Sequence, residues 1–306
     1  MEDQELTLPA PSAGFAFASF HPAALLCYFL GVLLIAMFSL NPGIALISAL
    51  GGLLFSASLQ RPGVFWGSIG YLLPLSLLIA AVNPLFNYNG ATPLFHLNGK
   101  PYTLESLLYG VLIAVTLIAV FCWFRCYSLI LTEDKFLFLF GRILPQISLI
   151  LTAALRFIPL FQKQYQKVRA AQKGMGIYSA KRFSDRFRAE IRVFSSILVW
   201  SLEHAIQTAD SMKARGYGSG KRGHFGIFHF TLRDGLLIGM TVLLVAISLV
   251  AMGVGALDIS FFPAIQPAPP SFLSVISYFC YSFLCFTPFV YEIKEKLKWK
   301  FFISSI

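Results

Sequence analysis

The sequence predicts an all-α, polytopic membrane protein with about six transmembrane helices and two long amphipathic cytoplasmic helices. Hydrophobic residues make up 57% of the 306 residues, the mean hydropathy is +0.72, and only 12% of the residues are charged. A soluble domain usually carries about 25% charged residues, so this chain is too apolar to face water alone. Apolar runs of membrane-spanning length also lie on both sides of a basic stretch from Thr132 to Arg233.

Six segments are predicted to span the bilayer, because a helix needs about 20 mostly apolar residues to cross the hydrocarbon core. They are Ala23–Leu40, Pro42–Leu59, Val64–Phe86, Glu105–Leu131, Gly235–Leu257 and Phe272–Tyr291. Three regions follow from this assignment. Residues 1–131 form an N-terminal membrane region with four spans, and residues 132–233 form a cytoplasmic or interfacial region. Residues 234–306 form a C-terminal membrane region with two spans and a basic tail.

The distribution of charge predicts the orientation in the membrane. The stretch from Thr132 to Arg233 holds 17 of the 24 Lys and Arg residues but only 6 of the 14 Asp and Glu residues. Cytoplasmic segments of membrane proteins are enriched in Lys and Arg, so this stretch and both termini are predicted to be cytoplasmic. Anionic lipid headgroups or an acidic protein partner explain the basic excess, and no nucleic acid partner is expected.

Two long helices are predicted inside the basic stretch, because apolar residues recur at spacings of three and four. The first stripe comprises Ile147, Ile150, Ala154, Ile158, Phe161, Tyr165 and Val168. The second stripe comprises Ile191, Phe194, Leu198, Leu202, Ala205, Ala209 and Met212. The interpretation that needs no partner protein is a pair of amphipathic helices that lie on the bilayer surface.

A repeated ending after each helix argues for more than surface binding. The segment from Gly176 to Arg182 (GIYSAKR) is echoed by the segment from Gly216 to Arg222 (GYGSGKR). Gly216 suits the left-handed cap that often ends a helix. A glycine-flanked tip with an arginine suits a groove with Asp or Glu at its base, because arginine makes bidentate hydrogen bonds to a carboxylate.

A nucleotide site at the second ending is not expected. The residues from Gly218 to Lys221 resemble the end of a phosphate-binding loop. The full motif needs glycine where this chain has Arg215, and Ser or Thr where it has Arg222.

The basic stretch resembles the transmembrane T component of energy-coupling-factor (ECF) transporters, the CbiQ/EcfT family. The segments that carry the resemblance are Leu155–Pro159, Ala171-Gln172 with its glycine-rich tip, Ala209-Asp210 and Met212–Tyr217. The similarity in architecture covers nearly the whole chain, and it is sharpest over Thr132–Arg222.

The resemblance implies a non-catalytic coupling subunit of an ATP-driven importer in the plasma membrane of a prokaryote. Its partners would be two ABC-type ATPase subunits, a small membrane S component that binds a vitamin or a transition-metal ion, and the lipid bilayer. ATP and Mg²⁺ would be bound by the ATPases, so no cofactor or metal site is expected in this chain. The substrate is not encoded here, because the S component selects it.

The resemblance also assigns site residues. The family's Ala-Arg-Gly tip is intact at Ala214, Arg215 and Gly216, and it aligns with Gly174, Met175 and Gly176 in the first helix, beside Lys173. Both tips would dock in grooves of the ATPases, and Arg215 would be the stronger anchor. The two helices would act as coupling helices, with a platform for the S component formed by Ile158, Phe161, Tyr165, Leu198, Leu202 and Ala205.

Three alternatives compete with this interpretation. A conventional ABC permease subunit also contacts its ATPases through cytoplasmic coupling helices. A secondary transporter usually keeps ionisable groups inside the membrane, whereas here Arg125 is the clear internal charge and Glu105 and Asp258 sit at span ends. A membrane enzyme needs a cluster of catalytic groups, but the five histidines are scattered, and the adjacent Glu203 and His204 point in different directions on a helix.

Overall fold

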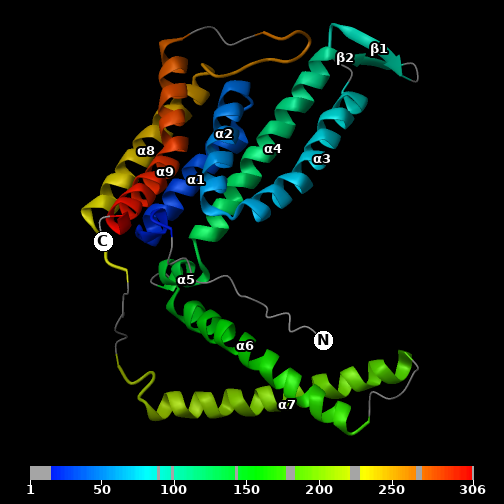
Figure 1. Cartoon of the computed structure of the whole chain (residues 1–306), viewed down its shortest axis with the longest axis vertical. Coiled ribbons are helices and arrows are strands. Elements are labelled where there is room, and N and C mark those ends of the chain that lie inside the picture. The colour runs from blue at the N-terminus through cyan, green and yellow to red at the C-terminus, as the bar shows by residue number, and fades with distance from the viewer. Residues whose placement is uncertain are drawn as a thin grey trace. The chain divides into compact units, whose positions relative to one another are not determined.

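The computed structural model describes residues 15–87, 90–97, 100–141, 144–176, 183–220, 228–266 and 271–304 (Figure 1). Its elements are η1 (Phe17–Ser19), α1 (Pro22–Phe38), α2 (Pro42–Leu59), α3 (Pro62–Phe86), β1 (Pro93–Leu97), β2 (Lys100–Thr103), α4 (Leu104–Ile130), α5 (Glu133–Gly141), α6 (Pro145–Gly174), α7 (Phe183–Ala214), α8 (Leu232–Gly253) and α9 (Phe272–Ser304). The chain divides into two compact units. Unit 1 comprises Met1–Phe136 and Phe228–Ile306, and unit 2 comprises Leu137–Ile227.

The predicted all-α, polytopic membrane class is confirmed. Among the residues that the structure describes, five helices are long and apolar enough to cross a membrane: α2, α3, α4, α8 and the part of α9 up to Trp299. The sixth predicted span, α1, is apolar but has only 17 residues. The observed helix ends differ from the predicted ones by a few residues, except in α9.

The membrane helices α2 and α8 begin at side-chain caps that satisfy backbone N–H groups. In α2, the Asn41 side chain accepts hydrogen bonds from the backbone of Gly43 and Ile44, at 2.8 and 3.4 Å, and Pro42 occupies the first helical position. In α8, the Asp234 carboxylate accepts from the backbone and hydroxyl of Thr231, at 2.8 and 2.6 Å. Such caps matter here because an unpaired N–H group costs several kcal/mol in hydrocarbon.

The core of unit 1 lies where α2 packs against α4 and α9, and where α1 packs against α8. Trp123 of α4 is fully buried, and its indole N–H donates to the Ser48 carbonyl at 3.1 Å. Glycines in α2 let the neighbouring helices come close. A Cβ at Gly51 would lie 2.8 Å from the Cβ of Cys285 in α9, and one at Gly52 would lie 3.1 Å from that of Cys122 in α4. Packing of small residues is the usual way in which helices associate inside a bilayer.

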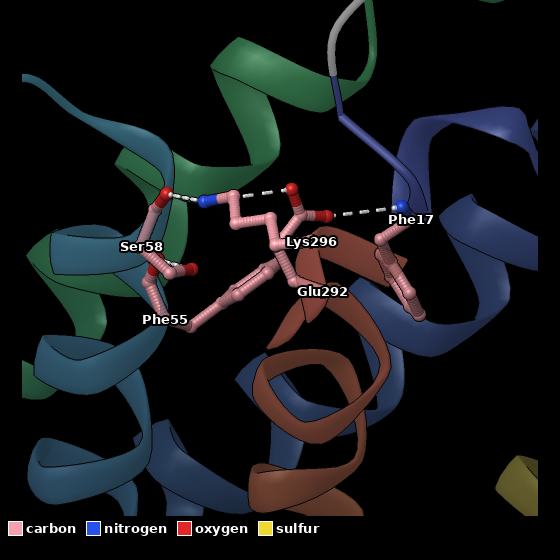
Figure 2. Close-up of polar contacts among 5 residues, drawn as sticks. All are labelled: Phe17, Phe55, Ser58, Glu292 and Lys296. Atoms are coloured by element: carbon pink, nitrogen blue, oxygen red, sulfur yellow. Dashed lines mark hydrogen bonds and ion pairs between the residues drawn. The ribbon is translucent and has the colours of Figure 1, made fainter. Parts of the chain in front are cut away.

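A buried carboxylate connects three elements of unit 1 (Figure 2). Glu292 of α9 is 1% exposed, and its Oε2 accepts a hydrogen bond from the backbone N–H of Phe17 at 3.3 Å. The ammonium of Lys296 lies 3.7 Å from Oε1 and donates to the carbonyl of Ser58 in α2. Glu292 and Lys296 therefore hold η1 and the end of α2 against α9.

Three features were not predicted. A β-hairpin of β1 and β2 lies between α3 and α4, where the sequence suggested only a loop. Glu105 supports it, because this buried carboxylate accepts from the hydroxyl of Thr92 at 2.8 Å. The short helix α5 is separate from α6, and α9 continues to Ser304 instead of ending near Tyr291. Pairing of Lys298 with Glu295, at 3.3 Å, is one of the contacts that favour helix in this extension.

Candidate functional site

The second tip is built by a regular helix-ending motif in unit 2. Helix α7 ends at Ala214, and Gly216 has a φ of +80°. The N–H of Gly216 donates to the carbonyl of Lys213 at 2.9 Å, and the N–H of Tyr217 donates to the carbonyl of Met212 at 3.0 Å. This pair of bonds defines a Schellman motif, in which a glycine adopts the left-handed conformation at low cost. The predicted left-handed cap at Gly216 is confirmed.

The first tip shares the described part of this geometry, up to Gly176. Helix α6 ends at Gly174, and Gly176 has a φ of +73°. The N–H of Gly176 donates to the carbonyl of Lys173 at 3.1 Å, as the N–H of Gly216 does to the carbonyl of Lys213. Met175 thus occupies the position, one residue before the left-handed glycine, that Arg215 holds in α7. The backbone geometry supports the alignment of Gly174-Met175-Gly176 with Ala214-Arg215-Gly216.

Both tips are exposed. The side chain of Met175 is 67% exposed, and Arg215 is exposed and forms no ion pair with any residue that the structure describes. Apart from the adjoining backbone and chain neighbours, no heavy atom of the described residues lies within 4 Å of the position that a Cβ would take at Gly174 or Gly218. The exposed side chain of Met175, and that of Arg215, which forms no ion pair within the described residues, are therefore accessible to another protein.

Aromatic side chains form the first half of the contact between α6 and α7. The ring of Trp200 lies 5.7 Å from that of Phe161 and 5.2 Å from that of His204, measured between ring centroids. Phe157 lies 5.6 Å from His204 and stacks on Phe161 at 6.0 Å. Edge-to-face and offset aromatic pairs contribute about 0.5–1.5 kcal/mol each beyond the area that they bury.

Glu190 forms the second half of this contact. Its carboxylate lies 3.4 Å from the guanidinium of Arg169 and accepts a hydrogen bond from the hydroxyl of Tyr165 at 3.2 Å. The guanidinium of Arg169 also lies over the Tyr165 ring, 5.7 Å from its centroid. Ala189 and Val193, on the same face of α7, are buried.

The two helices cross in an antiparallel sense. Phe157 in α6 meets His204 in α7, whereas Arg169, further along α6, meets Glu190, which lies earlier in α7. The tips at the carboxyl ends of α6 and α7 therefore lie at opposite ends of the crossed pair (Figure 1). We refer to the contacts of Phe157, Phe161, Tyr165, Arg169, Glu190, Trp200 and His204 as the α6–α7 crossing.

Of the six residues that the resemblance assigns to a platform, two lie between α6 and α7 and four are exposed. Phe161 and Tyr165 lie in the α6–α7 crossing, where they contact Trp200 and Glu190 of the same chain. The other four residues are exposed: Ile158, Leu198, Leu202 and Ala205. On α7, the predicted apolar stripe is thus mainly a face that the crossing does not use.

Sequence reasoning missed the residues of α7 that hold the crossing. Glu190, Trp200 and His204 belong to a second face, which also includes Ala189, Val193 and Ile197. The spacing of 4, 4, 3 and 4 between Ala189, Val193, Ile197, Trp200 and His204 indicates one face of a helix. The neighbouring stripe is more apolar, and for that reason it was predicted to be the packed face. Glu203 accepts from Gln207 at 3.3 Å and His204 packs on Trp200, so this adjacent pair does not act together.

The comparisons with known proteins agree on one family. The family model of CbiQ, described as a cobalt transport protein, matches residues 19–225. The energy-coupling factor transporter transmembrane protein EcfT of Listeria innocua is 34% identical over 101 residues, which cover 32% of this chain but only 38% of that protein. EcfT 1 of Listeria monocytogenes is 26% identical over 197 residues, covering 60% of this chain and 73% of that protein.

A third relative extends the match over more of the chain. The EcfT protein of Bacillus selenitireducens is 25% identical over 215 residues, covering 66% of this chain and 79% of that protein. The family model covers well over half of the chain, including α6, both tips and the crossing. The chain therefore belongs to the CbiQ family, as a transmembrane T component of energy-coupling factor transporters.

Proposed function

We propose that this chain is the coupling subunit of an ECF-type ABC importer for a vitamin or a transition-metal ion. In this proposal, the tips of α6 and α7 face the cytoplasm and dock in grooves of two ABC-type ATPase subunits. The helices transmit ATP-driven movement of the ATPases to a substrate-binding S component in the membrane. The ATPases hydrolyse ATP, and this chain acts as a non-catalytic subunit.

The observation that carries the proposal is the matched pair of tips. Met175 and Arg215 occupy the same position before a left-handed glycine, at opposite ends of one crossed pair of helices. Two similar tips suit two similar grooves, as a dimer of ATPases would present. An arginine that inserts into such a groove would meet a carboxylate at its base, since buried arginine needs a hydrogen-bonded acceptor.

The exposed face of α7 supports the S-component part of the proposal. Its large apolar side chains Leu198, Leu202 and Ile206 are exposed, although the helix lies in the more polar part of the chain. An apolar face of this length suits a hydrophobic partner protein better than water. We assign it to the S component because the tips lie outside this face.

Affinity purification of the full-length chain from its native membrane tests the proposal. The expected result is co-purification of two ABC-type ATPases and a small hydrophobic protein, identified by mass spectrometry. A photo-reactive amino acid in place of Tyr217 should cross-link to an ATPase, whereas the same probe in place of the exposed Lys163, midway along α6, should not. ATPases without a small membrane protein would favour a conventional permease, and no ATPase at all would contradict the proposal.

A further inference from the structure

A cavity of about 380 Å³ lies in unit 1, at the end where α8 begins. Its walls are Ser19 at the end of η1, Phe20 after it, the start of α8 with its N-cap from Thr231 to Asp234, and Tyr291 of α9. This volume falls at the lower end of the range of about 300–1,000 Å³ that is common for small-molecule sites. Neither the tips nor the α6–α7 crossing contribute to it.

The walls of this cavity are held by internal contacts. The backbone N–H of His21 donates to the Asp234 carboxylate at 2.7 Å, which ties the start of α1 to α8. The Phe20 ring lies 5.0 Å from the Tyr291 ring, and Glu292 binds the backbone of Phe17 (Figure 2). Because these contacts join η1, α8 and α9, the cavity is formed before any ligand enters it.

A positive and a negative side chain line the cavity, and the negative one already accepts hydrogen bonds within the protein. Arg233 lines it, is exposed, and forms no ion pair with the residues that the structure describes. Asp234 also lines it, but its carboxylate already accepts from His21 and Thr231. Lys294 lies three residues after Tyr291, on the same face of α9, and has no acidic partner in the described part of the chain.

The surface next to Arg233 is apolar. Leu232 is 89% exposed, and Leu236, one turn further into the predicted span, is 74% exposed. Two hydroxyl oxygens also line the cavity, and each already uses its proton. The hydroxyl of Ser19 donates to the Ala16 carbonyl and that of Thr231 donates to Asp234, so both oxygens can still accept a hydrogen bond.

We propose that this cavity binds the headgroup of an anionic phospholipid of the phosphatidylglycerol type. Arg233 and Lys294 neutralise the phosphate, and the hydroxyls of Ser19 and Thr231 accept hydrogen bonds from the glycerol of the headgroup. Leu232 and Leu236 lie along an acyl chain. Cations, hydroxyl acceptors and exposed leucines lie together at the end of a membrane helix. This combination fits a lipid better than free phosphate, because free phosphate has no apolar part to contact the leucines.

Lipid retention by the purified full-length protein in detergent tests this site. Native mass spectrometry should show that the wild type retains phosphatidylglycerol in preference to phosphatidylcholine with the same acyl chains. Each basic residue near an anionic lipid changes binding about fivefold, so the double variant Arg233→Gln/Lys294→Gln should lower this preference at least tenfold. The matched control Arg61→Gln/Lys163→Gln removes two exposed cations elsewhere and should retain the preference.

A second variant tests the cavity without a change of charge. Ser19→Phe fills the cavity and should also reduce retention of phosphatidylglycerol, and its thermal unfolding, followed by circular dichroism, should match that of the wild type. An equal loss in both double variants would mean general electrostatic attraction and would overturn the site. Retention unchanged in Ser19→Phe, or displacement of the lipid by inorganic phosphate at equal concentration, would also overturn it.

Discussion

At the scale of single residues, Arg215 and Met175 occupy equivalent backbone positions with different side chains. Removal of a charged anchor that is buried in a partner costs about 2–5 kcal/mol of binding, because the partner's carboxylate is left unpaired. Arg215→Ala should therefore weaken ATPase association by more than tenfold. Met175→Ala loses only packing and should have a smaller effect. A pull-down titrated with the ATPases measures both.

Lys213 provides the control for this ranking, because it is an exposed cation two residues before Arg215. Lys213→Ala should leave ATPase association close to that of the wild type. Equal tolerance of Arg215→Ala and Met175→Ala would contradict the assignment of Arg215 as the main anchor.

Lys135, in α5, gives a prediction about pH. Its side chain is 5% exposed, and its ammonium donates to the carbonyls of Ala18 and Ile130, at 2.6 and 3.0 Å. Burial lowers the pKa of Lys135 to about 8, below its ordinary value of 10.5. The unfolded chain thus holds this proton more tightly, so the contribution of Lys135 to stability rises as the pH increases from about 8 towards 10.5.

The measurement compares thermal unfolding of the wild type and Lys135→Met in detergent at pH 7 and pH 9.5. Methionine does not titrate, so the difference in midpoint between the two proteins should shift in favour of the wild type at the higher pH. A difference that stays constant across this range would show that Lys135 keeps its ordinary pKa.

At the scale of elements, the α6–α7 crossing sets where the tips lie. The Arg169–Glu190 pair is partly exposed, and such pairs contribute at most about 1 kcal/mol, whereas the ring of Trp200 packs against Phe161 between the two helices. Trp200→Ala should therefore broaden the distance distribution between spin labels at Met175 and Ser219, and Glu190→Gln should change it little.

Double electron–electron resonance on the doubly labelled full-length protein gives these distributions. Leu202→Ala is the matched control, because it shortens an exposed apolar side chain on another face of α7. A distribution in Trp200→Ala as narrow as in the control would place the rigidity of the pair outside the aromatic contacts.

The elements were predictable to different degrees. The membrane helices and both tips follow from apolar runs and glycine positions, which are local signals. Which element packs against each helical face depends instead on residues that are distant in the sequence. The stripe through Leu198 and Leu202 resembles a buried face, yet it is exposed, while the less apolar face with Glu190 and Trp200 packs on α6. The β-hairpin escaped notice because its support comes from Glu105, outside the strands.

At the scale of the whole molecule, the tips and the exposed face of α7 should bind different partners. Leu198→Asp/Leu202→Asp places charge on the proposed platform, and it should release the small membrane protein while the ATPases remain bound. Arg215→Ala should have the opposite effect. Quantitative mass spectrometry of the purified complexes measures both ratios.

These two variants serve as controls for each other, because each leaves the other surface intact. Loss of both partners from either variant, with normal thermal unfolding, would mean that the two surfaces are not separate.

The buried carboxylate of Glu292 has a consequence for the order of biosynthesis. Its partner Phe17 lies 275 residues earlier, so it leaves the ribosome long before α9 does. Lys296 of the same helix already lies 3.7 Å from the carboxylate, whereas the hydrogen bond from the Phe17 backbone forms only when α9 reaches η1. We therefore expect the N-terminal segment to help place the last helix. Protease protection of a C-terminal tag should be lost when residues 1–20 are deleted, and retained when the deletion stops at residue 10.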